Sequence, residues 1–293
     1  MLHDSIRDLR HTLRRLTRTP GFTIATIATI ALGIGANTAI FSVIYSVLLK
    51  PLPFPEPDRL IGVWQTAPGV NIADLNPSLA DYITYKEHSQ TFADVAIWGA
   101  RSATVTEFSE PEFVDGLLVT HRLLPMLGVQ PAMGRQLREK DSVEGSPEVV
   151  LLGHGYWQRH YGGDEHVIGK TMRIEGRPHE IVGVLPREFW FLDHKHEIVR
   201  PLRYDRGKVT LAGYNWRGIA RLKPGVTIEQ ANADVARMIA IEFGKFPPPP
   251  GMNLESLRDA RLGPKVRLLK QDLLGDTGKS LWVVMATIGI VLL

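Results

Sequence analysis

The sequence predicts an α+β extracytoplasmic domain between two transmembrane α-helices. Two stretches without a charged residue, 22–49 and 281–293, predict the membrane helices. Between them, segments with helical periodicity and segments with strand alternation intermix along the chain. Residues 170–186 alternate on both sides of a turn, as a β-hairpin does. Such an irregular mixture of helices and hairpins is typical of the α+β class.

The composition excludes several classes of protein. The chain has 293 residues, enough for one or two domains, and its lack of cysteine excludes disulfides and thiolate metal sites. Its net charge of +3 equals that of residues 1–20, which carry five arginines against Asp4 and Asp8. A nucleic-acid-binding protein usually carries its basic residues across a folded face, so we expect no nucleic-acid partner.

Residues 1–21 are expected to form a cytoplasmic, basic, amphipathic segment. Ile6, Leu9, Leu13 and Leu16 recur at helical spacing with arginines on the other faces, which favours a helix lying on the membrane surface. Residues 20–21, Pro-Gly, would end this helix. A solvated basic tail and a helix that docks a partner are the alternatives.

The uncharged run at 22–49 predicts the first transmembrane helix. It is longer than the about 20 residues that span a bilayer and the about 7–15 apolar residues of a signal peptide, so we expect an uncleaved helix. Five arginines precede it, whereas only Lys50 and Arg59 follow closely. The positive-inside rule therefore predicts a cytoplasmic N-terminus, with the residues after the helix outside.

Small and polar residues within this run indicate that the helix packs in a bundle. Ala31, Gly35 and Ala39 lie four apart and form a ridge that lets another helix approach closely. Asn37 is polar at membrane depth, where a hydrogen bond to a neighbouring helix is favoured over a role in lining a path.

Residues 50–279 are expected to form the extracytoplasmic domain. It begins with a stiff, proline-rich exit at 51–58 and a helix at 77–92 that Ser78 and Asp81 cap. Strands follow at 94–107, then a short helix within 123–137, a buried strand at 148–153 and a helix at 154–163.

The second half of this domain begins with the hairpin at 170–186. A strand and turn at 215–225 precede a helix at 226–243, which Thr227 and Gln230 cap. A proline break at 247–250 and a last strand at 265–271 complete the domain. The apolar face predicted for the helix at 226–243 consists of Ile228, Ala231, Val235, Met238 and Ile239.

Residues 275–280, Gly-Asp-Thr-Gly-Lys-Ser, resemble the tail of a Walker A loop, but the first glycine of that loop is missing. Counting back places Leu273 at its position. We interpret the stretch as a polar turn before a second membrane helix that starts at 280–293 and continues past the end of this chain. A short buried terminal helix is the alternative. Lys279 is expected to have no role in nucleotide chemistry.

No catalytic, cofactor-binding or metal-ligating residue is assigned, so we expect no enzyme activity. His154 and His160 do not share a helix face, and His194 and His196 bracket a lysine whose charge disfavours a metal. Asp and Glu residues are scattered, and no G-x-S-x-G or H-E-x-x-H motif occurs. Core packing, and not ligand binding, is predicted for Trp64, Trp98, Trp157, Trp190 and Trp216.

Residues 19–60, TPGFTIATIATIALGIGANTAIFSVIYSVLLKPLPFPEPDRL, closely resemble the start of bacterial ABC transporter permeases of the MacB/FtsX type, above all an acidobacterial group of orphan permeases. The similarity continues at 127–137, 149–186 and 220–235. The resemblance implies that residues 50–279 are a MacB-like periplasmic core domain. It implies two lobes, one of β-α-β units and one mixed insertion at roughly 115–205. It also implies four membrane helices, of which this chain would end inside the second.

The resemblance further implies a function in efflux or export. MacB carries a fused ATPase domain before its first helix, where this chain has only residues 1–21. A separate ABC ATPase on the cytoplasmic side is therefore the implied partner. Such permeases convert ATP hydrolysis into motion of the outer domain. The resemblance also implies a homodimer or heterodimer in the bacterial inner membrane, a periplasmic adaptor as a further partner, and no catalytic residue in the permease itself.

Two other classes share part of this layout. A signalling receptor also places an outer domain between two membrane helices, and a cytoplasmic signalling domain after the second helix would distinguish it. A membrane-anchored enzyme would need an acidic or histidine cluster, which the sequence does not contain.

Overall fold

The computed structural model describes residues 19–45, 50–108, 110–191, 194–275, 283 and 287. The chain divides into two compact units, one of residues 1–51 and 274–293 and the other of residues 52–273. Three predicted features lie outside the described residues: the amphipathic helix within 1–18, the turn containing Lys279, and nearly all of the second membrane helix.

The first unit contains the helix α2, Pro20–Ile44, which is 25 residues long and apolar. Within it, Pro20–Ser42 has a mean hydropathy of 1.8 and no part is buried inside the structure, so α2 is long and apolar enough to cross a membrane. The hydroxyls of Thr29, Thr38 and Ser42 donate to carbonyls four residues earlier, at 2.7–2.8 Å. These polar groups are therefore satisfied within the helix, as a lipid environment requires. The predicted helix is present as far as the structure describes it.

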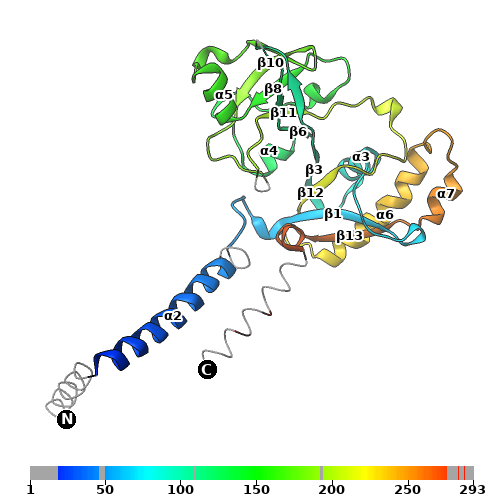
Figure 1. Cartoon of the computed structure of the whole chain (residues 1–293). Coiled ribbons are helices and arrows are strands. Elements are labelled where there is room, and N and C mark those ends of the chain that lie inside the picture. Colours follow the sequence, from blue (N-terminus) through cyan, green and yellow to red (C-terminus); the bar gives the residue numbers. More distant parts are fainter. Residues whose placement is uncertain are drawn as a thin grey trace. The chain divides into compact units, whose positions relative to one another are not determined.

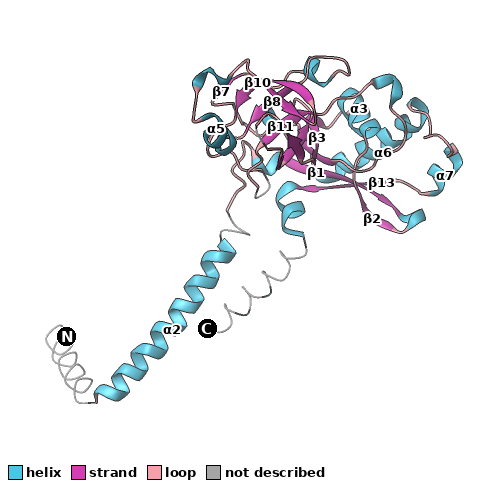
Figure 2. Cartoon of the chain, turned by 45° about the horizontal axis from the view of Figure 1, so that its top comes forward, coloured by secondary structure: helices cyan, strands magenta, loops and turns pink. Residues whose placement is uncertain are grey.

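The second unit is a mixed α/β domain built on one large sheet (Figures 1 and 2). The described strands are β1 (Leu60–Ala67), β2 (Ile72–Leu75), β3 (Phe92–Ala100), β4 (Ala103–Val105), β5 (Glu112–Val114), β6 (Gly116–Val119), β7 (Met133–Gly134), β8 (Val149–Leu152), β9 (Thr171–Ile174), β10 (Arg177–Val184), β11 (Ile198–Pro201), β12 (Arg217–Leu222) and β13 (Gly263–Leu268). The described helices of this unit are α3 (Leu79–His88), α4 (Leu123–Met126), α5 (His154–Tyr161), α6 (Ile228–Lys245) and α7 (Leu254–Asp259).

The sheet combines antiparallel and parallel pairs. Its order is β13-β1-β12-β3-β6-β11-β8-β10-β9-β4-β5, with β2 on β1 and β7 on β10. The strands from β13 to β6 pair antiparallel, whereas β6 pairs parallel with β11 and β8 pairs parallel with β10. Parallel neighbours need a crossover connection, and α5 and β9 lie in the chain between β8 and β10. This mixed sheet confirms the predicted α+β class.

Both predicted helix caps are present. The Ser78 side chain accepts from the N–H of Asp81, whose carboxylate accepts from the N–H of Ser78, so the two residues form a capping box for α3. Thr227 and Gln230 form the same arrangement at the start of α6. These reciprocal bonds satisfy N–H groups that have no partner within the helix, which is why both helices begin where the sequence predicts.

Backbone geometry explains two further confirmed elements. The hairpin of β9 and β10 turns at Glu175 and Gly176, which both have positive φ (50° and 75°), as a tight two-residue turn requires. The helix α5 ends at Gly162, whose left-handed conformation (φ 59°) stops the helix without the steric cost that a Cβ would bring.

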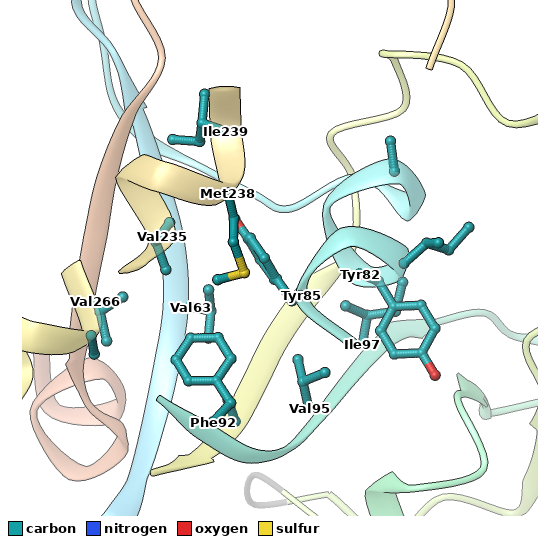
Figure 3. Packing of buried hydrophobic residues seen from close by; sticks show 14 of the residues in the cluster. Val63, Tyr82, Tyr85, Phe92, Val95, Ile97, Val235, Met238, Ile239 and Val266 are labelled. Carbon is teal, nitrogen blue, oxygen red and sulfur yellow. The ribbon is translucent and has the colours of Figure 1, made fainter. Parts of the chain in front are cut away.

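The core of the domain lies on both faces of the sheet. On one face α3 and α6 pack against β1, β3, β12 and β13, and Figure 3 shows Tyr85, Phe92, Val235 and Met238 directed into this core. The ring centroids of Tyr85 and Phe92 lie 6.0 Å apart, edge to face. Four of the five apolar residues predicted for α6 are buried here: Ala231, Val235, Met238 and Ile239.

The prediction of the last strand needs correction, and several elements were not predicted. The last strand, predicted at 265–271, ends at Leu268, and the chain is helical from 269, where Leu-Lys-Gln-Asp-Leu-Leu consists mainly of helix formers. The helix α7 was not predicted, although Asn253 caps it by accepting from the N–H of Ser256 at 2.7 Å. Strands β1, β6 and β11 were not predicted either, because they are buried on both faces and show no alternation.

A buried polar cluster lies between α3 and α6. Gln65 donates to the Asp81 carboxylate and, at 2.9 Å, to the Tyr85 hydroxyl, which itself donates to Asp81 at 3.3 Å. Glu242 of α6 is only 1% exposed, and neither of its carboxyl oxygens has a hydrogen-bond partner in the described residues. Burial, and then the negative charge of Asp81, raise the pKa of Glu242 well above its ordinary value. Burial, and then interaction with Asp81 and Glu242, raise the pKa of the neighbouring Tyr85 and Tyr214 as well.

We expect Glu242 to make the domain less stable as the pH rises. The folded domain keeps a proton on Glu242 that the unfolded chain releases above about pH 4.5. The contribution of Glu242 to the free energy of unfolding is therefore complete below about pH 4.5. As the pH rises from there towards the raised pKa, this contribution falls by up to about 1.4 kcal/mol per pH unit. Glu242→Gln keeps the neutral shape and should flatten this dependence. Chemical unfolding of residues 52–273 at pH 5 and pH 8 measures how the free energy of unfolding changes with pH. An equal change in the wild type and in Glu242→Gln would show that Glu242 is not the group responsible.

Candidate functional site

His154 and His160 lie among aromatic side chains in the residues that the structure describes. No group of three or more His, Asp or Glu side chains there could hold a metal ion. His160 lies 2.9 Å from Glu112 and stacks between Phe108 and Tyr156, at ring distances of 4.6 and 4.3 Å. His154 packs edge to face on Trp157. Packing against aromatic side chains therefore explains the positions of His154 and His160.

The tryptophans divide between core and surface. Trp98 is 6% exposed and belongs to a core, and Trp157 and Trp216 pack at the edges of two others. Trp190 is 54% exposed, and the Lys195 ammonium lies 4.8 Å from its ring centroid. The prediction of core packing is wrong for Trp190, because the loop after β10 leaves this ring at the surface, where a cation covers it.

The segments by which the chain enters and leaves the domain lie on neighbouring strands. Residues 52–59 lead into β1, and residues 269–273 follow β13. β1 and β13 pair antiparallel with Ile61 opposite Leu268, so the start of one strand lies beside the end of the other (Figure 1). We call residues 52–60 and 267–273, with Arg221, the entry–exit clamp.

Two arginines hold the entry segment on the domain. Arg59 donates twice to the Leu222 carbonyl, from Nε at 2.9 Å and from Nη2 at 2.7 Å. Arg221 of β12, 9% exposed, donates to the Glu56 carbonyl at 3.1 Å and to the Met126 carbonyl at 2.7 Å. Burial lowers the pKa of Arg221, but a guanidinium remains charged at neutral pH. A charged donor with two carbonyl acceptors makes stronger hydrogen bonds than a neutral one.

Apolar packing supports the same segment. Leu52 and Phe54 pack against the core formed by β1, β3, β6 and α4. Gly128, with φ 73°, lets Pro55 approach: a Cβ there would lie 2.6 Å from the Pro55 ring. The entry segment therefore rests on the domain along its length rather than forming a free linker.

Charge pairs hold the exit segment. Arg267 donates to Asp272 at 2.5 Å and to Asp74 of β2 at 2.8 Å, while Asp74 also accepts from Lys265 at 2.9 Å. Burial alone would lower the pKa of Arg267, but these two carboxylates raise it. Gly62 of β1 leaves room for the Asp272 side chain, because a Cβ at position 62 would clash with it. The exit segment is thus bonded to β13 and, through Arg267, to β2, and it lies close to β1 at Gly62.

The clamp joins the entry and exit segments to neighbouring strands of one sheet. The entry segment is bonded to β12 and the exit segment to β13, and both strands pair with β1. The helix α6 packs on β13. A pull on either segment would act on paired strands and on a packed core, which deform little. Sequence reasoning assigned no role to Arg59, Arg221 or Arg267. An arginine between apolar neighbours in Ile-Ala-Arg-Leu was the available signal for Arg221, since a buried arginine needs acceptors.

The domain resembles solved structures of transporter domains. The periplasmic region of MacB from Actinobacillus actinomycetemcomitans aligns with a TM-score of 0.50 and 15% identity, covering 74% of this chain and 97% of that chain. A domain of a candidate permease from Porphyromonas gingivalis aligns with a TM-score of 0.53 and 18% identity, covering 73% of this chain and 92% of that chain. The extracellular domain of YknZ, a noncanonic ABC-type transporter from Gram-positive bacteria, aligns with a TM-score of 0.48 and 15% identity. The alignment covers 64% of this chain and 95% of that chain.

This domain has the fold of the first two structures. Their sequence identities to this chain, 15% and 18%, support a shared fold and no further property. No curated protein sequence matches the chain. The family model of the MacB-like periplasmic core domain matches residues 23–238, which is well over half of the sequence. The chain therefore belongs to the family with a MacB-like periplasmic core domain, the outer part of MacB/FtsX-type ABC transporter permeases.

Proposed function

We propose that this chain is the N-terminal part of a permease subunit that couples ATP hydrolysis by a separate ATPase chain to motion of its outer domain, for efflux or export. The observation that carries the proposal is the entry–exit clamp. The chain enters on β1 and leaves after β13. The entry segment is bonded to β12 and the exit segment to β13, and both of these strands pair with β1. A helix movement would thus reach the domain at one place.

The proposed arrangement has four parts. Residues 1–21 are a cytoplasmic basic segment, 22–49 the first transmembrane helix, 50–279 the periplasmic core domain, and 280–293 the start of the second transmembrane helix. The five arginines before α2 favour a cytoplasmic N-terminus in a bacterial inner membrane. Two lobes, with an insertion at roughly 115–205, are proposed for the core domain by its family membership.

The partners follow from the same proposal. The sequence lacks the first glycine of a Walker A loop, and family membership supports an ATPase on the cytoplasmic side as the source of energy for movement. A second permease copy or a related permease, a periplasmic adaptor and the lipid bilayer complete the proposed surroundings. A signalling receptor is the alternative, and no feature of the clamp favours it.

The ATPase assignment can be tested on the full-length permease purified with its ATPase. We expect Lys279→Ala to leave ATP turnover nearly unchanged, because Leu273 replaces the first glycine of a phosphate-binding loop. Substituting the Walker A lysine of the ATPase should abolish turnover in the matched sample. A fall of about 100-fold or more with Lys279→Ala, the size of a lost transition-state contact, would contradict the proposal.

A further inference from the structure

Two buried carboxyl groups meet between α3 and α6, and only one of them has hydrogen-bond donors. Asp81 of α3 is fully buried and accepts from the Ser78 N–H and hydroxyl, at 2.7 and 2.8 Å. Its other carboxyl oxygen accepts from Gln65 and Tyr85. Glu242 of α6 is 1% exposed, and no donor among the described residues reaches either of its carboxyl oxygens. Because the four donors hold Asp81 as the carboxylate, the proton of this pair belongs on Glu242, which can donate it to Asp81.

Loss of this proton would place a second negative charge in a closed site. The groups that act on the charge of Glu242 are Asp81, Tyr85 and Tyr214, and none of them is positively charged. A buried charge without a compensating partner is costly and two carboxylates in contact repel, so the ionised pair needs water. Tyr214 belongs to the loop 209–216, and its hydroxyl is buried with no partner in the part of the chain that the structure describes. This loop therefore covers the site.

The loop 209–216 is weakly bonded to the rest of the domain. Within the described backbone, two hydrogen bonds join it to distant segments. The Leu211 N–H donates to the Pro247 carbonyl at 2.9 Å, and the Trp216 N–H donates to the Pro77 carbonyl at 3.3 Å. A segment with so few hydrogen bonds opens locally at a lower free energy than the whole domain unfolds.

We propose that the loop 209–216 is a pH-controlled lid, closed while Asp81 and Glu242 share one proton and opened locally when Glu242 loses it. Opening lets water reach both carboxylates while the strands of the sheet stay paired. The loop also lines a cleft of about 380 Å³ with Leu79 and Tyr204, and opening would reshape this cleft. The lid is independent of the entry–exit clamp and of the proposed transport function.

Hydrogen exchange of the purified 293-residue chain in detergent tests the lid, at pH 6 and pH 8 and with the intrinsic exchange rates divided out. Peptides that span 209–216 should be at least about 100-fold less protected than peptides that cover β8, because the lid opens without unfolding of the sheet. The closed lid keeps a proton on Glu242 that the open lid releases, so closure weakens as the pH rises. The protection of the loop should therefore fall by about tenfold to 100-fold from pH 6 to pH 8.

Two glutamate variants of α6 identify the responsible group. Glu242→Gln keeps a neutral side chain of the same shape, and the protection of its loop should be equal at pH 6 and pH 8. Glu229→Gln removes an exposed carboxylate in the first turn of the same helix and should respond as the wild type does. The same fall in Glu242→Gln as in the wild type, or a lost response in Glu229→Gln, would overturn the proposal.

The wild type alone also decides the question if a variant does not fold. Equal protection of the loop 209–216 and of β8 would mean that only global unfolding exposes the carboxyl pair, which would overturn the lid. Loop protection that does not change between pH 6 and pH 8 would overturn it as well.

Discussion

Asp81→Ala is expected to lower the free energy of unfolding of the domain by about 3–5 kcal/mol, because it removes the shared acceptor of a buried network. Asp81 is fully buried and accepts from the Ser78 N–H and hydroxyl at 2.7 and 2.8 Å. It also accepts from Gln65 and Tyr85. Without the carboxylate, these donors remain buried with no acceptor, and α3 loses half of its capping box.

One effect opposes this loss. The charge of Asp81 contributes to the raised pKa of Glu242, so its removal lets Glu242 ionise more easily and reduces the pH dependence of stability. Asp81→Asn should therefore be less damaging than Asp81→Ala, since it keeps an acceptor and removes the charge. Urea unfolding of residues 52–273 measures both variants, with Asp259→Ala at the exposed end of α7 as the control. A loss below about 1 kcal/mol for Asp81→Ala would show that the network contributes little.

Arg221→Met is expected to release the entry segment from the domain. The variant keeps an apolar side chain of similar reach but removes the donor shared by the Glu56 and Met126 carbonyls. Each lost bond to a charged donor should cost about 1.5–3 kcal/mol, so the entry segment, then held only by Arg59 and its apolar contacts, should become more mobile. Transmission of force through β1 would then fail, although the packed cores would stay folded.

The measurement uses the absence of cysteine from the chain. Spin labels on Asp58→Cys in the entry segment and Glu229→Cys at the start of α6 should give a narrow distance distribution in the wild-type background. In Arg221→Met the distribution should broaden clearly, whereas Arg258→Met, on the surface of α7, should leave it unchanged. An unchanged distribution in Arg221→Met would mean that Arg59 and the apolar contacts hold the segment without it.

Local sequence patterns predicted much of the fold. The capping boxes at Ser78 and Thr227, the turn at Glu175 and Gly176, and the glycine after α5 are all decided by residues close together in the chain. Strands β1, β6 and β11 escaped prediction because their burial on both faces comes from distant partners. Short apolar runs of this kind cannot be distinguished from buried helix by periodicity.

The clamp could not be predicted from the sequence for the same reason. Arg59 bonds to the Leu222 carbonyl across 163 positions, and Arg221 to the Glu56 carbonyl across 165. Such contacts depend on strand order, which no local pattern contains. Trp98 and Arg217 likewise meet only because β3 and β12 pair in one register. The prediction of a packing role for Trp98 is correct for its ring, but it did not anticipate the unpaired indole N–H.

Single-cysteine labelling tests most directly whether the domain lies outside the membrane and the N-terminus inside. Arg10→Cys and Glu255→Cys, the latter on the exposed surface of α7, would each be the sole cysteine of the full chain. A membrane-impermeant maleimide added to intact spheroplasts should label Glu255→Cys and leave Arg10→Cys unlabelled until the membrane is permeabilised, as the five arginines before α2 predict. Labelling of Arg10→Cys in intact cells, with Glu255→Cys protected, would contradict the account.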